Sequence, residues 1–392
     1  MSAKLKVLIT IIFMDLLAGM EFDLFVPSFP ELKNQFHLSP SLVEALLSVN
    51  FLGYCLSLFV VGWLSDRYGR KPIILSGLTM FVIGSVVCLW PQSYAFLLIG
   101  RFLQGVGVAA PAILSFLIIA DTYALKQQQY FIAMLNGAMN ISVACSPVIG
   151  SYITLYFHWQ GNFTALLLLG LLVLAMTAIF VPTTKLPKHP ETTSVQGYIS
   201  LLKSKPLMLL ITYIVLMCIP YWIFVGMSPL LYIKSLGVSL SHFGYYQGSM
   251  ALVFAFGSIV FGFMLNKYKQ KKALHCSTFI FIAAFIGIAL VTAFDTHNPL
   301  WITLVMIIFC VGQIIPSTIL YPFALNFVPH AKGRVSAIMN SGKLIFSAAG
   351  LQLAAYYYRG TFQNLGIILA VIVLLVIILQ FLVVEHRELQ SS

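Results

Sequence analysis

The stretch GWLSDRYGRKP, residues 62–72, carries four charges in a chain in which only 8% of the residues are charged. It joins two apolar runs, near 41–65 and 73–91, that are each long enough to cross a lipid bilayer as a helix. A related stretch, GFMLNKYKQKK, follows at residues 262–272, with the glycine, the tyrosine and a lysine in register. A charged turn between two spans, with a second copy in the other half of the chain, predicts a membrane protein with an internal duplication.

The amino-acid composition requires lipid as the solvent for most of the surface. Of the 392 residues, 60% are hydrophobic, and the mean hydropathy is +0.96, which is more apolar surface than a soluble protein of this length could bury. The apolar runs are continuous and do not alternate, which excludes a transmembrane β-barrel. We therefore predict an all-α polytopic membrane protein with twelve transmembrane helices, near residues 5–27, 41–65, 73–91, 95–120, 130–156, 162–181, 207–233, 241–266, 273–294, 300–327, 335–358 and 362–384.

The basic residues predict the orientation of these spans. A net charge of +11 would suggest nucleic-acid binding in a soluble protein, but here the lysines and arginines fall between the spans. Most of them lie on the side of the two termini, and the loops of the opposite side hold only Lys33, Lys234 and Arg359. The positive-inside rule then places both termini in the cytoplasm, and no nucleic-acid partner is expected.

The longest connection between spans divides the chain into two similar halves. Residues 182–206 are rich in proline and lysine and predict a cytoplasmic linker between six-helix halves at 1–181 and 207–392. The motif VGxxxP occurs at 106–111 in the fourth span and again at 311–316 in the tenth span. Two six-helix halves around a central site are the architecture of repeat-built transporters.

Four motifs resemble those of one known transporter family. The pattern G-x-L-x-D-R-x-G-R-K-P at 62–72 is similar to the turn between the second and third spans of the major facilitator superfamily. RFLQGVG at 101–107 resembles the fourth-span motif of its drug:proton antiporter branch, and WQGNF at 159–163 resembles an element before the sixth span. FDLFVPSFP at 22–30 resembles the first-span ending of the Bcr/CflA-type multidrug efflux proteins.

This resemblance covers the whole chain and implies alternating access in a bacterial cytoplasmic (inner) membrane, driven by the proton gradient without a cofactor. The chain departs from the family at two places. The fifth span reads SPVIGS at 146–151, where the antiporter motif ends in G-P-x-x-G-G, although Pro147 and Gly150 keep the small size that tight helix packing needs. Lys343 stands in the eleventh span where relatives usually carry glutamine.

Ionisable residues inside the spans are the first functional candidates, because each is costly at bilayer depth. Asp15 lies roughly 16 Å along the first span from Lys4, near the bilayer midplane, and Asp23 lies about 80° away on the same broad face. Glu21 lies about 160° from Asp23, so a straight helix cannot direct all three acids to one site. Such carboxyls can bind and release protons near neutral pH, which predicts proton coupling through Asp15, Asp23 and Glu21; the alternative is a structural ion pair. Arg101 could take part in the coupling directly or hold Asp23 ionised as its charge partner.

Lys343 is the second candidate, because the C-terminal half offers no acid deep enough in the membrane to pair with it. If it faces the central site, it could bind a carboxylate or a phosphate; pairing with an acid of the first half and snorkelling to the surface are the alternatives. The softer candidates for substrate binding are polar or aromatic residues in the middle of spans, each of which could instead make a hydrogen bond between helices. They are Tyr54, Asn136, Asn140, Tyr221, Trp222, Gln313 and Asn340.

The turn that opens the sequence argument is predicted to act as a cytoplasmic gate. Gly62 would let a neighbouring helix approach, and Gly69 would permit a tight bend. Asp66 could accept hydrogen bonds from Arg67 or Arg70, or cap a helix of the other half across the inner mouth. The second copy has Asn266 and Lys269 in place of the aspartate and the second glycine, which predicts an asymmetric gate; Pro147 and Gly150 complete the set of gating candidates.

Secondary active transport is therefore the leading hypothesis, as proton-coupled efflux of a small amphiphilic molecule by a monomer. Lys343 keeps open the export or import of an anionic metabolite, such as a carboxylate siderophore or a nutrient, and a membrane sensor or assembly protein is the alternative from another class. An enzyme is not expected, since no nucleophile, histidine and acid set or metal cluster lies at membrane depth. The P-loop pattern of ATP-driven pumps is absent from the sequence.

Overall fold

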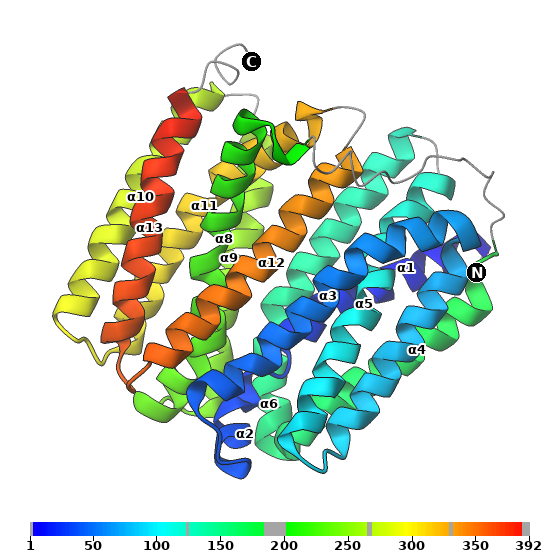
Figure 1. Cartoon of the computed structure of the whole chain (residues 1–392), viewed down its shortest axis with the longest axis horizontal. Helices are drawn as coiled ribbons and strands as arrows, with labels where there is room; N and C mark the ends of the chain where they lie inside the picture. The colour runs from blue at the N-terminus through cyan, green and yellow to red at the C-terminus, as the bar shows by residue number, and fades with distance from the viewer. Residues whose placement is uncertain (1–2, 123–124, 184–200, 265–268, 329–331, 386–392) are drawn as a thin grey trace. The chain divides into compact units, whose positions relative to one another are not determined.

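The apolar runs form helices in the computed structural model, which describes residues 3–122, 125–183, 201–264, 269–328 and 332–385 (Figure 1). No β-strand occurs in these ranges, and the side chains of some helical residues, among them Asp66, Asn136 and Asn140, lie outside the described part. The long helices are α1 (Ala3–Asp23), α3 (Pro40–Tyr68), α4 (Arg70–Leu89), α5 (Tyr94–Thr122), α6 (Leu125–Phe180), α8 (Lys205–Pro229), α9 (Leu240–Met264), α10 (Gln270–Ala293), α11 (Pro299–Phe327), α12 (Lys332–Tyr357) and α13 (Phe362–Glu385).

Each predicted span coincides with one of these helices, and α6 accounts for two of them. His158 interrupts α6 with a φ of 59° and a ψ of −174°, so the element consists of two helices that meet at this residue. Within the described ranges, 9 stretches are long and apolar enough to cross a membrane. Helices α1 and α12 are not among them, because ionisable residues interrupt the apolar run of α1 and polar residues lower the hydropathy of α12. The prediction of an all-α membrane protein with twelve spans is confirmed.

The first span ends earlier than predicted. The run 5–27 was expected to be one helix, but α1 ends at Asp23, and a 3-10 turn (Val26–Ser28) and the short helix α2 (Phe29–Gln35) follow it. Pro27 and Pro30 explain the break, because proline has no N–H to donate to the preceding turn. Asp23 therefore occupies the last position of α1.

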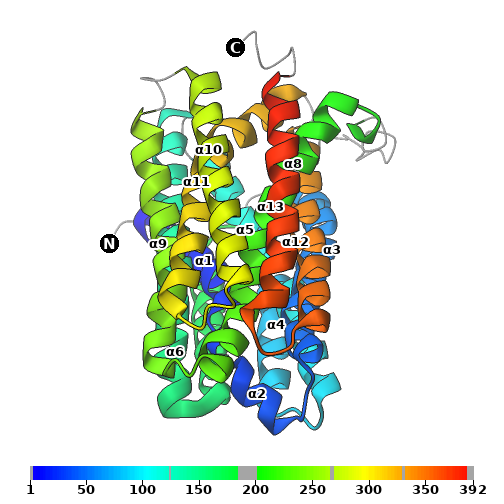
Figure 2. The ribbon, with the colours of Figure 1, turned by 90° about the vertical axis from the view of Figure 1, so that its left-hand side faces the viewer.

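The chain divides into two compact units, the first comprising Met1–Thr192 with Leu240–Gly248 and the second Thr193–Ser239 with Ser249–Ser392. In the first unit, α5 packs against both α3 and α4, and α6 contacts α1 and α4. In the second unit, α10 lies beside α11 and α13, while α8 contacts α11, α12 and α13 (Figure 2). The predicted linker falls mostly on residues 184–200, outside the described part.

Glycines set how closely the helices of the first unit approach one another. A Cβ added to Gly105 of α5 would lie 2.1 Å from the carbonyl oxygen of Asn50 in α3. One added to Gly107 would lie 2.4 Å from the backbone nitrogen of Phe81 in α4. The backbones of α3 and α4 can touch α5 only because no side chain intervenes there, and this contact brings Asn50 to the level of Arg101.

Candidate functional site

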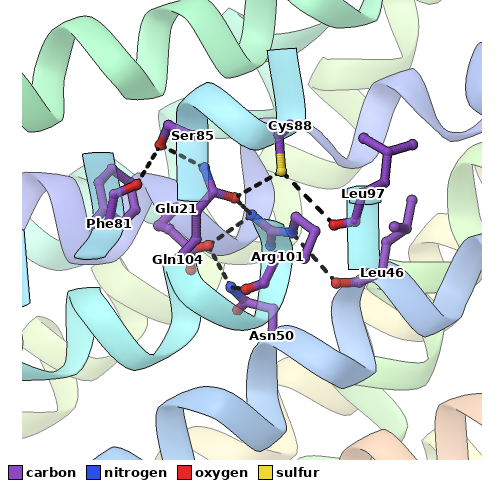
Figure 3. Close-up of polar contacts among 9 residues, drawn as sticks. All are labelled: Glu21, Leu46, Asn50, Phe81, Ser85, Cys88, Leu97, Arg101 and Gln104. Carbon is purple, nitrogen blue, oxygen red and sulfur yellow. Dashed lines mark hydrogen bonds and ion pairs between the residues drawn. The ribbon is translucent and has the colours of Figure 1, made fainter. Parts of the chain in front are cut away.

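The centre of the first unit holds an ion pair that water does not reach. Arg101 of α5 donates from Nη1 to Oε1 of Glu21 in α1 over 2.7 Å, and both side chains are 0% exposed (Figure 3). The same Nη1 is 2.7 Å from Oε1 of Gln104, one turn along α5. Such a pair contributes little net stability over apolar side chains, but loss of one partner leaves a bare buried charge. Its presence at this depth therefore indicates a function other than stability.

Further polar side chains from α3 and α4 complete this network. Asn50 Nδ2 donates to Glu21 Oε1 over 2.7 Å and to the carbonyl oxygen of Arg101 over 3.0 Å. Gln104 Nε2 donates to Ser85 Oγ over 2.8 Å, so four helices meet at the pair (Figure 3). Glu21 thus accepts two donors on one oxygen, which fixes the orientation of its carboxylate.

Aromatic packing holds the Arg101 guanidinium from another side. Its Cζ lies 3.9 Å from the centroid of the Phe25 ring, and its Nε lies 3.4 Å from the carbonyl oxygen of Leu46. Phe25 follows the end of α1, so the early termination of this helix is what places the ring over the cation. A cation in contact with an aromatic face is stabilised by the quadrupole of the ring.

Arg101 does not pair with the acid that the sequence suggested. One of the two roles considered for Arg101 was to hold Asp23 ionised, but it binds Glu21, which lies about 160° from Asp23 around the helix axis. Sequence spacing gives the angle between the two acids but not which of them α5 approaches, and the contact of Asn50 with both Glu21 and Arg101 decides this. The structural ion pair and the candidate proton-binding acids are consequently different residues of α1.

Three other carboxyls of the first unit are buried without partners. Asp15 is 1% exposed, Asp23 is 2% exposed and Glu44 is 0% exposed, and neither oxygen of any of them has a hydrogen-bond partner among the described residues. The charge of Glu21 also acts on Asp23. Burying an unpaired carboxylate in an apolar environment is strongly unfavourable, so these groups can be accommodated when they carry a proton.

Glu44 was not singled out from the sequence, although a signal for it was present. It lies in the second turn of α3, inside the apolar run that begins at residue 41. Although it lies near the start of this helix, its side chain is 0% exposed. Gln104 and Ser85 were missed as well, because uncharged polar residues inside a span are individually uninformative.

The turn between α3 and α4 has the predicted bend and an unpredicted partner. Gly69 has a φ of 93°, which a side chain would oppose, so the expected tight bend is confirmed. Arg70 forms an ion pair with Asp121 at the end of α5, with 3.2 Å between Nε and Oδ2, and donates to Ser65 Oγ over 2.7 Å. Asp121 was not identified from the sequence, because nothing in the chain order links the end of α5 to this turn.

Two other expectations for this turn have different outcomes. We expected Gly62 to let a helix approach; among the described residues, a Cβ there would meet no atom within 4 Å. Arg67 is exposed, with its Cζ 5.3 Å from the ring centroid of Tyr68. The side chain of Asp66, the proposed acceptor of this turn, lies outside the described part.

The small residues of the fifth span pack as tightly as predicted. Pro147 and Gly150 are buried in the first half of α6. A Cβ on Gly150 would lie 2.0 Å from the carbonyl oxygen of Leu24, directly after α1. The two helices therefore meet where α1 ends, next to Asp23, and a larger residue at position 150 would separate them.

The structure distributes the softer candidates over both units. In the second unit, Gln313 donates to the carbonyl oxygen of Met217 over 3.3 Å, and Asn340 Nδ2 lies 3.2 Å from Tyr321 Oη. Both contacts are hydrogen bonds between helices, which was the alternative to substrate binding for such residues. Three of the remaining candidates make contacts between aromatic rings: Tyr54 with Phe22, and Tyr221 with Trp222. The side chains of Asn136 and Asn140 lie outside the described part.

Lys343 of α12 lies in the second unit, half-buried, with its Nζ 4.4 Å from the centroid of the Tyr321 ring. Among the residues with described positions, no group of three or more His, Cys, Asp or Glu side chains could hold a metal ion. The described ionisable groups well inside the spans thus differ between the units: acids and Arg101 in the first, and Lys343 in the second.

Comparisons with known proteins agree with this architecture. A family model described as Major Facilitator Superfamily matches residues 11–351. Multidrug resistance protein MdtL of Escherichia coli O45:K1 (strain S88 / ExPEC) is 27% identical over 381 residues, which cover 94% of this chain and 94% of that protein. MdtL of Klebsiella pneumoniae (strain 342) is 26% identical over 338 residues, covering 85% and 84% of the two chains.

Solved structures of other transporters share the fold. A D-xylose–proton symporter superposes with a TM-score of 0.76 at 15% identity, covering 97% of this chain and 98% of the other. The peptide transporter POT in complex with sulfate gives a TM-score of 0.76 at 15% identity, covering 96% and 93%. At these identities the likeness extends to the fold and not to the substrate.

Proposed function

Because the chain belongs to the Major Facilitator Superfamily, it is a multi-pass membrane transporter and not an enzyme, and we propose that it exports a small amphiphilic molecule in exchange for protons. The curated relatives named above are multidrug resistance proteins, which supports export of amphiphiles. The proton gradient supplies the energy, and no cofactor is needed. The protein acts as a monomer in a bacterial inner membrane, with both termini in the cytoplasm.

The observation that carries the proposal is the set of acids of α1 beside a buried arginine. Asp15 and Asp23 have no hydrogen-bond partner among the described residues and are almost fully buried. Each carboxyl is neutral when it carries a proton. Its charged form is unfavourable in this buried position unless water or a cationic group reaches it. When a conformational change opens such a carboxyl first to one side of the membrane and then to the other, the carboxyl takes up a proton on one side and releases it on the other.

Glu21 and Arg101 have a different role in this scheme. Asn50 donates to the same carboxylate oxygen of Glu21 as Arg101 does, and Gln104 accepts from Arg101, so these contacts hold the pair in one orientation. We propose that Arg101, Asn50 and Gln104 keep the Glu21 carboxyl in a fixed position, from which its charge acts on Asp23.

The turn between α3 and α4 acts as the cytoplasmic gate in this proposal. Gly69 supplies its bend, and Arg70 ties it to Asp121 at the end of α5. Gly62, Asp66 and Arg67 belong to the same gate by their position, while Pro147 and Gly150 let α6 move against the end of α1. The gate is asymmetric, because the second copy carries Asn266 where the first carries the acid.

Gradient-driven transport in everted membrane vesicles tests the proposal. Vesicles energised by respiration should accumulate ethidium, a cationic amphiphile, and the accumulation should collapse when an uncoupler is added. Asp15→Asn and Asp23→Asn should each reduce accumulation at least about tenfold, because one lost protonation step uncouples the cycle. Asp295→Asn, a half-exposed acid after α10, is the matched control and should leave accumulation unchanged. Full accumulation in both α1 variants at normal protein levels would refute the role of these acids.

A further inference from the structure

Lys343 carries an ammonium group within a span of the second unit, and among the described residues it forms no ion pair with a carboxylate. It is half-buried in α12, and the contact observed for its charge is the Tyr321 ring, whose centroid lies 4.4 Å from Nζ. The described acids of this unit are Asp295, which follows α10, and Glu385, the last residue of α13. Neither forms an ion pair with Lys343 within 4 Å in the described part of the chain.

The aromatic contact stabilises this charge only in part. A cation over a ring face gains less than an ammonium group loses when it leaves water, so Lys343 would be better stabilised by an anion. An ammonium group has three donors and no acceptor, and a ring face uses none of them as a directed hydrogen bond to oxygen. Since the side chain is half-buried and not fully enclosed, an external anion can reach it.

Polar groups of three helices gather around this lysine. Tyr321 Oη of α11 lies 3.2 Å from Nδ2 and 3.4 Å from Oδ1 of Asn340, which is one turn before Lys343 in α12. On the α8 side, the charge of Lys343 acts on Cys218, whose Sγ lies 3.7 Å from Gln313 Nε2. Lys343, Tyr321 and Asn340 thus supply a cation, a phenol and an amide next to one another.

We propose that these three residues bind the carboxylate of a transported amphiphile, so that the substrates of this protein include aromatic carboxylates. This rests on the proposed transport function and specifies its substrate class. Lys343 supplies the counter-charge, and the phenol and the amide donate hydrogen bonds to the second carboxylate oxygen. The Tyr321 ring gives the apolar part of the substrate a face to stack against. A lysine serves here as a point charge that can follow the carboxylate through the conformational change.

Three ligands with one ring system test this proposal: 2-naphthoate, 2-naphthylmethanol and 2-naphthylmethylammonium. Their affinities for the purified full-length protein in detergent are measured by isothermal titration calorimetry at pH 7.5. The wild type should bind the carboxylate at least about tenfold more tightly than the alcohol, the step expected for a hydrogen bond to a charged group. Lys343→Gln should remove this preference while leaving the affinity for the alcohol unchanged. Lys343→Arg should retain most of it, and Tyr321→Phe should reduce it.

The control is Lys272→Gln, which removes an exposed lysine from the start of α10 in the same unit and should change none of the three affinities. Melting temperatures of all variants without ligand show whether each is folded. Lack of naphthoate binding by the wild type, or an unchanged carboxylate preference in folded Lys343→Gln, would overturn the proposal. The proposed function is tested separately by ethidium in wild-type vesicles. Uncoupler-sensitive accumulation there supports proton-driven efflux even if carboxylate recognition fails.

Discussion

The buried pair between Glu21 and Arg101 gives the sharpest energetic prediction. Arg101→Met removes both 2.7 Å contacts of Nη1 and leaves the Glu21 carboxylate with Asn50 as its remaining donor. Glu21→Gln leaves the guanidinium with a neutral acceptor and no counter-charge. Removing one partner of a buried pair costs about 3–5 kcal/mol, so each single variant should lose that much free energy of unfolding.

The double variant Glu21→Gln/Arg101→Met should be more stable than the sum of the single effects implies. Neither buried charge remains in it, and replacing a buried ion pair with side chains of similar volume is often close to neutral. Additivity would predict a loss of about 6–10 kcal/mol, whereas the structure predicts a coupling of about 3 kcal/mol or more between the two changes. Unfolding by SDS in mixed micelles, followed by tryptophan fluorescence, measures all four corners of this cycle.

An exposed pair in the same unit is the control for this cycle. His158 Nδ1 lies 2.9 Å from Glu31 Oε1, but the two side chains are 75% and 33% exposed. Its coupling should stay below about 1 kcal/mol, because water screens such pairs. Additive effects of the Glu21 and Arg101 variants, or a coupling no larger than that of the exposed pair, would show that the buried charges do not depend on each other.

Three further predictions follow from the packing of the first unit. Gly105→Ala should lower the melting temperature, because its Cβ would meet the Asn50 carbonyl oxygen at 2.1 Å, and should reduce transport by displacing Asn50. The control Gly62→Ala, whose Cβ would meet no described atom within 4 Å, should fold normally. Equal melting temperatures for the two variants would contradict this packing. Glu44→Met should raise the free energy of unfolding by about 1–3 kcal/mol, since it removes two buried oxygens that have no hydrogen-bond partner among the described residues. A loss of stability in SDS unfolding would mean that Glu44 has a partner. Asp121→Asn should cost less than about 1 kcal/mol of unfolding free energy, because its pair with Arg70 is partly exposed. If this pair belongs to the gate as we propose, the variant should slow ethidium transport, and an unchanged transport rate would exclude that role.

Hydropathy and charge were sufficient to predict the spans, because lipid requires continuous apolar runs and helices that satisfy their own backbone. The end of α1 was the exception. Pro27 was visible in the sequence, but only the structure shows that Asp23 closes the helix and that Phe25 then covers Arg101. Local sequence thus defined where a helix can end, while the packing of neighbouring helices defined where it does end.

The partners of the candidate residues were less predictable than the residues themselves. Glu21, Asp23 and Arg101 stood out because charge is rare in lipid, yet the choice of Glu21 by Arg101 depends on how α1 is rotated against α3 and α5. Asp121 and Glu44 were missed for a related reason. Their importance comes from contacts with, or burial by, helices distant in the sequence, which a single chain does not reveal.

Proton exchange is the central claim, and proteoliposomes test it directly. The purified protein is reconstituted with a pH-sensitive dye inside the vesicles, the membrane potential is set to zero with potassium and valinomycin, and ethidium is added outside at equal pH. Inward movement of ethidium through the protein should drive protons out and raise the internal pH, and Asp23→Asn liposomes should show uptake without this change. Ethidium uptake by the wild type without any change of internal pH would contradict antiport.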